Sequence, residues 1–106
     1  MRHFATVVIG GGAAGIMAAG VAASRGGNVL LCERMEKPQR KVRITGKGRC
    51  NLTNLCSEEE FLAKVRCGAD FFASALHRFD SEATMRFFER IGVPLTVERG
   101  RRVFPS

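Results

Sequence analysis

The sequence predicts an α/β fold that opens with a strand, a helix and a second strand. Two short apolar runs, residues 4–9 (FATVVI) and 28–33 (NVLLCE), are typical of buried strands. Between them lies an alanine-rich stretch, Ala13 to Arg25, which is typical of a helix and is closed by two glycines. Three further glycines, Gly10 to Gly12, separate the first run from this helix. Such a unit is expected to be a right-handed crossover between parallel strands.

The next segment, residues 34–56, is basic and interrupted by Pro38, Gly46 and Gly48. We expect it to be mostly loop, with a short strand or turn near residues 42–45. Residues 57–92 are expected to be helical. Ser57 followed by Glu60 fits a capping box, which predicts a helix running to residue 66.

Two more helices and a second sheet are predicted after it. Residues 70–79 are expected to form one helix, and Asp80 or Ser81 to cap another that places Met85, Phe88 and Ile91 on one face. In residues 93–106 a weakly alternating run, 93–98, precedes Arg-Gly and a second short run, 102–104. This pattern predicts the start of a second sheet as a β-hairpin.

Length and composition limit the function classes. At 106 residues the chain is expected to be at most one domain, and no apolar run is long enough to cross a membrane. The four cysteines form no C-x-x-C pair and the two histidines are isolated, so we expect no metal site and a reducing, cytoplasmic compartment. The net charge is +7, and seven cations fall within residues 34–49: Arg34, Lys37, Arg40, Lys41, Arg43, Lys47 and Arg49. A basic excess favours polyanionic partners, nucleic acid or phosphorylated small molecules.

Gly10, Gly12 and Gly15 form a G-x-G-x-x-G sequence between the first strand and the helix. The first glycine permits a tight turn, the second lets a pyrophosphate approach the backbone, and the third lets the helix pack closely on the sheet. Ala13 and Ala14 keep the surface open, and the helix directs its free amides and positive dipole end at the phosphates. The alternative is a glycine-rich turn that binds no nucleotide.

An acid ends the second strand. Glu33 stands where a carboxylate accepts hydrogen bonds from the adenosine ribose, and it disfavours a nucleotide with a 2′-phosphate. Arg34, the next residue, is placed to lie along the adenine or a phosphate. The sequence thus predicts a dinucleotide site in a Rossmann-like βαβ unit, although this spacing fits NAD and FAD alike.

Four motifs in this order carry a more specific resemblance: VVIGGGAAGIMAA, E-R-x-E-K at 33–37, RKVRITGKGRCNLTN at 40–54 and GVPLTVERGRRVFP at 92–105. The whole chain resembles the N-terminal portion of the bacterial NAD(P)/FAD-dependent oxidoreductases, the flavoprotein family related to aminoacetone oxidase and dehydro-bile-acid reductase. The resemblance implies an incomplete FAD-binding domain without its later strands, substrate domain or C-terminal return. The family usually has glycine where Gln39 stands and a leucine or isoleucine where Arg43 stands.

The resemblance also implies site residues. FAD is the expected cofactor, with NAD(P)H as a reductant of the full-length protein. The pyrophosphate would be held by Gly10, Gly12, Ala14 and Gly15, and the ribose by Glu33. Lys41 and the loop Gly46–Asn51, with Gly48, Arg49 and Cys50, would run along the cofactor towards the flavin.

No residue is predicted to be catalytic. Cys50, set among cations, is either a flavin-facing thiol or a structural one. Cys32 is expected to be a small buried residue of its strand. Two alternatives stay open for the chain as a whole: a non-catalytic fragment, or a small nucleic-acid-binding protein, which is disfavoured because no reading motif is present.

Overall fold

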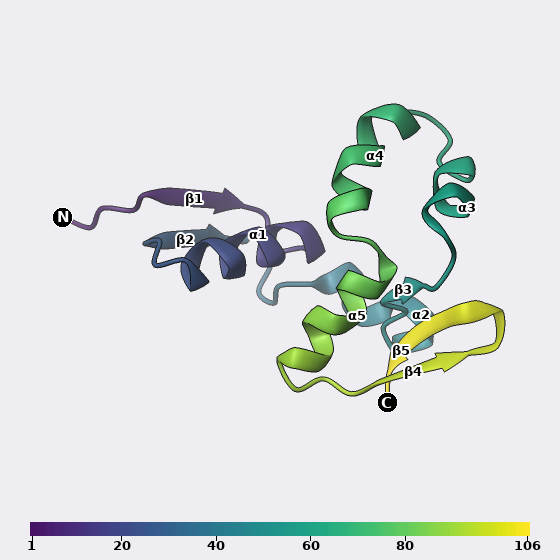
Figure 1. Cartoon of the computed structure of the whole chain (residues 1–106). Coiled ribbons are helices and arrows are strands. Elements are labelled where there is room, and N and C mark those ends of the chain that lie inside the picture. Colours follow the sequence, from purple (N-terminus) through teal and green to yellow (C-terminus); the bar gives the residue numbers. More distant parts are fainter. The chain divides into compact units, whose positions relative to one another are not determined.

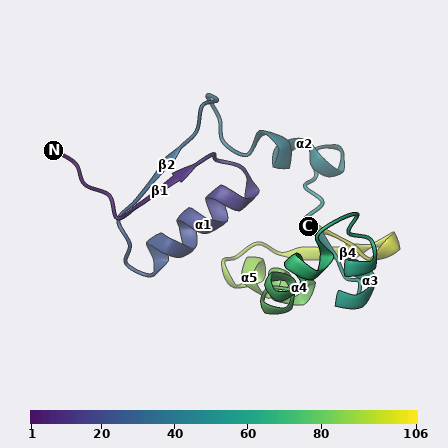
Figure 2. The same ribbon diagram turned by 90° about the horizontal axis from the view of Figure 1, so that it is seen from above.

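The computed structural model describes residues 1–106. Its N-terminal part contains a pair of parallel strands. Strand β1 (Thr6–Ile9) and strand β2 (Val29–Cys32) are joined by helix α1 (Ala13–Ser24). In register, Thr6 lies opposite Val29 and Ile9 opposite Cys32. Figures 1 and 2 both show α1 lying along the two strands. The predicted strand–helix–strand unit is therefore present, with strands shorter than the apolar runs.

Only one face of this sheet is covered. Val8 and Leu31 face α1 and are half-buried, because side chains alternate between the two faces of a strand. On the opposite face Val7, Ile9 and Leu30 are exposed, and Cys32 is exposed beside them. The prediction of fully buried strands is wrong for this face, and so is the prediction of a buried Cys32. Continuous apolar runs are typical of strands that are covered on both faces, whereas in this sheet α1 covers one face.

The basic segment contains a helix where a loop with a short strand or turn was expected. Helix α2 (Arg40–Gly48) begins with regular turns, since the amide of Arg43 donates to the carbonyl of Gln39 at 3.0 Å. The helix is interrupted at its end, where Gly46 and Lys47 both have left-handed backbone with φ near +58°. The long side chains at the start of α2 favour helix, and this local propensity decides against a strand at residues 42–45.

The chain divides into two compact units, a first unit (Met1–Gly48) and a second unit (Arg49–Ser106). The second unit holds an antiparallel sheet in the order β3–β5–β4. Its elements are β3 (Thr53–Asn54), α3 (Glu58–Ala63), α4 (Ala69–Arg78), α5 (Ser81–Arg90), β4 (Leu95–Glu98), the 3₁₀ turn Arg99–Arg101 and β5 (Arg102–Pro105). The predicted hairpin is confirmed as β4 and β5. The short β3 was not predicted, because two residues leave no periodic pattern.

The core of the second unit is small and lies under the central strand. Val103 and Phe104 of β5 are buried, and Leu76 of α4 is buried as well. Ser81, at the start of α5, is the buried polar residue: its hydroxyl donates to the carbonyl of Asn54 at 2.6 Å. This hydrogen bond attaches α5 to β3.

Side-chain caps fix where the helices of the second unit begin. The hydroxyl of Ser57 accepts from the amide of Glu60 at 3.1 Å, and the carboxylate of Asp80 accepts from the amide of Ala83 at 2.8 Å. Both predicted caps are confirmed. Helix α3, however, ends at Ala63 instead of residue 66.

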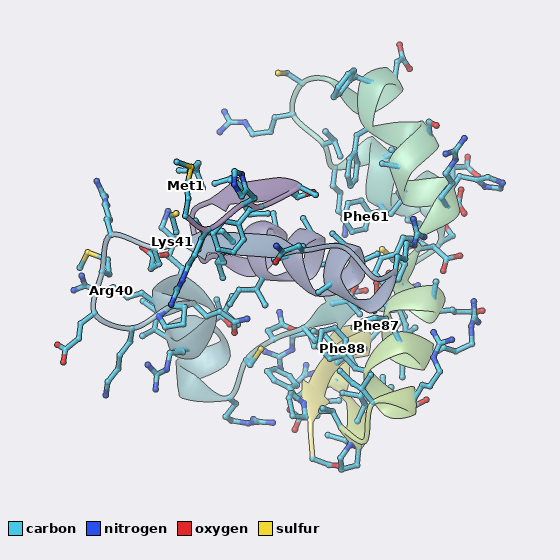
Figure 3. The ribbon with its side chains drawn as sticks, turned by 90° about the vertical axis from the view of Figure 1, so that its left-hand side faces the viewer. Met1, Arg40, Lys41, Phe61, Phe87 and Phe88 are labelled. Atoms are coloured by element: carbon cyan, nitrogen blue, oxygen red, sulfur yellow. The ribbon has the colours of Figure 1, made fainter.

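Aromatic pairs join the helices of the second unit. Phe61 of α3 lies 5.9 Å from Phe72 of α4, and Phe79, the residue after α4, lies 6.1 Å from Phe87 of α5, measured between ring centroids. Phe87 also lies 5.3 Å from Phe88 of the same helix. Figure 3 shows the side chains of Phe61, Phe87 and Phe88. Ile91 was expected beside Met85 and Phe88 but is 60% exposed, because the helix ends at Arg90 and the chain turns away there. No helix of the chain combines the length and apolar character needed to cross a membrane.

Candidate dinucleotide-binding site

The glycine-rich turn between β1 and α1 has the geometry that its sequence predicts. Gly10 has φ of +101°, a conformation that side chains disfavour. A Cβ atom added to Gly15 would lie 1.8 Å from the carbonyl oxygen of Gly10, so α1 is packed directly against the turn. A Cβ atom added to Gly12 would have no protein atom within 4 Å. Gly10 and Gly15 are thus required by the chain itself, whereas nothing in the chain requires Gly12 to be glycine.

The start of α1 offers free hydrogen-bond donors. Gly12 is the N-cap residue and has no side chain to accept from the first turn of the helix. The amides of Ala13, Ala14 and Gly15 therefore lack the acceptor that a serine or aspartate cap would supply. Ala13 and Ala14 are exposed. Uncapped amides beside an open surface are suited to an anion.

Glu33 reaches from the end of β2 back to the glycine turn. Its Oε2 accepts from the amide of Gly11 at 2.7 Å, and its Oε1 accepts from the amide of Met35 at 3.1 Å. The hydrogen bond from Met35, and to a smaller extent that from Gly11, lowers the pKa of the Glu33 carboxyl below its ordinary value of 4.5. An ionised carboxylate only accepts hydrogen bonds, and each oxygen keeps a lone pair for a further donor.

Gly11 is a site residue that the sequence analysis missed. Besides binding Glu33 it accepts, through its carbonyl oxygen, a hydrogen bond of 2.7 Å from the amide of Gln39. A Cβ atom at Gly11 would lie 2.9 Å from Oε2 of Glu33 and 3.1 Å from the side chain of Pro38. The sequence indicates this role only in that Gly11 is the middle one of three consecutive glycines. Gln39 itself has φ of +58°, a left-handed backbone conformation that glycine adopts without steric cost.

A shallow pocket of about 370 Å³ follows Glu33 in the first unit. It is lined by Met35, Glu36, Lys37, Arg40, Arg43 and Ile44. Arg34 and Lys41, both predicted site residues, are exposed in the same unit and form no ion pair. The surroundings of the pocket are therefore cationic and accessible.

The remaining predicted residues fall at the junction of the two units. Gly46 and Gly48, with φ of +58° and +85°, shape the end of α2 in the first unit. Arg49, Cys50 and Asn51 belong to the second unit, and Cys50 is itself left-handed with φ of +61°. The structure thus brings the glycine turn and Glu33 together as one site, and it places Arg49–Asn51 in the other unit.

Residues of the hairpin hold Arg49. Its guanidinium forms an ion pair with Glu98 of β4 and lies over the ring of Phe104 of β5, 4.3 Å from the ring centroid. The sequence analysis did not predict these contacts, because they join residues about fifty positions apart. No group of three or more His, Cys, Asp or Glu side chains is placed to hold a metal ion.

Comparison with known proteins identifies the family. The model of the HI0933-like protein Rossmann domain matches residues 4–106, almost the whole chain. The chain belongs to this family. As a HI0933-like Rossmann domain it falls among FAD-binding oxidoreductases, and the resemblance drawn from its four motifs is confirmed.

Two curated relatives of this HI0933-like chain are longer proteins. It is 39% identical over 102 residues to a 3-dehydro-bile acid delta(4,6)-reductase of Clostridium scindens, covering 92% of this chain and 24% of that protein. It is 42% identical over 79 residues to a ribosomal RNA dihydrouridine synthase of Escherichia coli, covering 74% of this chain and 19% of that protein. The chain therefore spans about a fifth to a quarter of the length of these relatives.

Proposed function

We propose that this chain binds the adenosine diphosphate part of FAD and serves a flavin-dependent reductase. The observation that carries the proposal is the open space at Gly12. The fold itself leaves room for a side chain there, with no atom within 4 Å of an added Cβ, beside uncapped amides at the start of α1. Gly20 in the middle of α1 has the same open space, but Gly12 combines it with the uncapped helix amides, and a ligand that touches the backbone explains this combination.

The pyrophosphate is assigned to the glycine turn. Gly10, Gly12 and Gly15 have no side chain and Ala13 and Ala14 have only a methyl group, so the amides of the first helical turn would be accessible to donate to its oxygens. The dipole of α1 adds a partial positive charge at the same end of the helix.

The ribose is assigned to Glu33. Its carboxylate is held by the amides of Gly11 and Met35, so it is pre-oriented and ionised, and it would accept hydrogen bonds from the ribose hydroxyls. A 2′-phosphate at this position would be repelled by the same charge. Arg34, exposed next to Glu33 in the chain, offers a surface for the adenine.

The flavin end is assigned to the second half of the basic segment. Lys41 and the residues Gly46, Gly48, Arg49, Cys50 and Asn51 would lie along the cofactor and offset its negative charge. When bound, the flavin supplies the hydride, and NAD(P)H is the proposed source of its electrons. The chain's own contribution is binding and orientation, in a protein expected to work in the cytoplasm.

FAD titration with paired glycine variants tests this proposal. Gly12→Glu puts a carboxylate at the proposed pyrophosphate position. Gly20→Glu adds the same charge later in α1, where an added Cβ also meets no atom within 4 Å. The expected result is saturable FAD binding by the natural protein and by Gly20→Glu, with binding lost in Gly12→Glu. Equal binding by both variants would refute the assigned site.

A second candidate concerns the substrate. The names of the two relatives refer to different kinds of substrate, a 3-dehydro-bile acid for the reductase and ribosomal RNA for the dihydrouridine synthase. One observation favours RNA. Six cations within residues 34–47 are exposed and none forms an ion pair: Arg34, Lys37, Arg40, Lys41, Arg43 and Lys47. Unpaired surface cations are available to bind phosphates.

The salt dependence of RNA binding separates the two substrate classes. If the cations contact RNA, the triple variant Lys37→Ala, Arg40→Ala, Arg43→Ala should reduce the slope of log affinity against log salt by about 2, since each phosphate contact contributes about 0.7 for single strands. FAD binding should persist in the same variant. An unchanged slope, or no RNA binding by the natural protein, would leave a small molecule of the bile-acid kind as the better substrate class.

A further inference from the structure

We propose that Glu98 and Phe104 are positioning residues for Arg49, and that through Arg49 they fix the loop at the flavin end of the cofactor. The inference rests on the proposed function, which assigns Arg49, Cys50 and Asn51 to that end. It adds a role for the β4–β5 hairpin, none of whose residues was assigned to the site.

The contacts of Arg49 are made by two different strands. Glu98, the last residue of β4, forms an ion pair with the guanidinium, and the ring of Phe104 from β5 lies beneath it with 4.3 Å from the guanidinium carbon to the ring centroid. Arg102 lies 5.7 Å from the same ring centroid. A planar guanidinium that is both ion-paired and stacked on an aromatic ring is restricted in direction as well as in place.

Phe104 is a rigid support for this arrangement. It is 2% exposed and belongs to the core of the second unit, next to the fully buried Val103. The Arg49 side chain, in contrast, is 52% exposed, so its outer edge remains free to meet a ligand. A side chain that is anchored on one edge and open on the other suits a group that orients an anionic cofactor.

The backbone of the same loop is attached to the hairpin independently. The amide of Leu52 donates to the carbonyl of Val103 at 2.8 Å, and β3 then pairs with β5. Between these anchors Cys50 adopts left-handed backbone with φ of +61°. A residue other than glycine keeps that conformation only where its surroundings impose it. The hairpin therefore determines both the path of the loop and the direction of Arg49.

A double-variant cycle on the protein in its full natural length tests the inference. The variants are Arg49→Met, Glu98→Gln and the two together, with Glu89→Gln as control, because Glu89 is exposed on α5 and forms no ion pair. The readouts are the FAD dissociation constant, the visible absorption spectrum of the bound flavin and the thermal midpoint. Glu98→Gln is expected to weaken FAD binding by about threefold to tenfold and to shift the spectrum, with the thermal midpoint near that of the control.

The combination decides whether Glu98 acts through Arg49. If it does, Glu98→Gln has no further effect in the Arg49→Met background, and Glu98→Asp restores part of the binding. Additive losses in the double variant, or a Glu98→Gln spectrum identical to that of the natural protein, would overturn the inference. If the natural protein binds no FAD, or if Arg49→Met binds it unchanged, the proposed function of this loop fails and the inference fails with it.

Discussion

Replacing Gly15 by alanine should destabilise the protein although alanine is the better helix former. Gly15 is the third residue of α1, where the helix approaches the glycine turn. An added Cβ would lie 1.8 Å from the carbonyl oxygen of Gly10 and 3.4 Å from Cγ1 of Val8. The first of these contacts is with backbone, which cannot rotate away as a flexible side chain would.

The expected cost follows from that distance. Cβ atoms are essentially never found within 3.0 Å of a heavy atom to which they are not bonded. The Cβ of residue 15 and the carbonyl oxygen of Gly10 must therefore move apart by at least about 1.2 Å, which separates α1 from the turn. Overpacking of this kind costs about 1–3 kcal/mol, and the gain in helix propensity from glycine to alanine returns about 1 kcal/mol. With a backbone neighbour the cost lies at the upper end, and we expect a net loss of about 2 kcal/mol.

Urea unfolding followed by circular dichroism measures this loss. Gly20→Ala is the matched control, because Gly20 lies in the same helix and an added Cβ meets no atom within 4 Å. The control should gain about 0.5–1 kcal/mol from propensity alone. If Gly15→Ala is as stable as Gly20→Ala, the close approach of α1 to the turn is wrong, and the structural reason for the third glycine is wrong with it.

Three further predictions concern other parts of the chain. Gln39→Gly should raise the unfolding free energy by up to about 1 kcal/mol in urea titrations, because Gln39 holds φ of +58°; a loss of stability would contradict this reading. Because the pKa of Glu33 is lower in the folded protein, its hydrogen bonds to Met35 and Gly11 should add stability above pH 4.5 that is lost as the pH falls through the lower folded value. The thermal midpoint of Glu33→Gln should therefore fall less on acidification than that of the natural protein. Equal falls in both proteins would count against a contribution of ionised Glu33 to stability. Phe104→Ala should lower the free energy of unfolding, measured in urea, by about 3–5 kcal/mol, because Phe104 is buried. Phe71→Ala, at a side chain that is 93% exposed, should change it by no more than about 0.5 kcal/mol. Similar losses in both variants would argue against the core described.

Local sequence signals predicted the elements whose causes are local. The glycine turn, the Ser57 and Asp80 caps and the β4–β5 hairpin all depend on residues within a few positions of each other. A loop with a short strand or turn was expected near residues 42–45, and α2 forms there instead because helix propensity after Gln39 outweighs a short β-branched run. The burial of β1 and β2 was misjudged because burial depends on neighbours that a strand's own sequence does not specify.

The same limit applies to the candidate site. The glycines and Glu33 could be predicted, since their spacing along the chain reflects the geometry of a single turn. The role of Gly11 was missed because the motif treats its position as variable. The ion pair between Arg49 and Glu98 could not be predicted, because nothing in either residue's surroundings along the chain indicates that the hairpin returns to that loop.

The uncovered face of the β1–β2 sheet carries its own chemical reporter. Cys32 lies exposed on that face beside Ile9 and Leu30, so its thiol is open to an alkylating reagent whenever the face is open. Any element or molecule that covers those apolar side chains also shields the sulfur. The alkylation rate of Cys32, compared by peptide mass spectrometry with that of exposed Cys67 in the second unit, therefore measures the fraction of molecules in which the face is covered, without any introduced label.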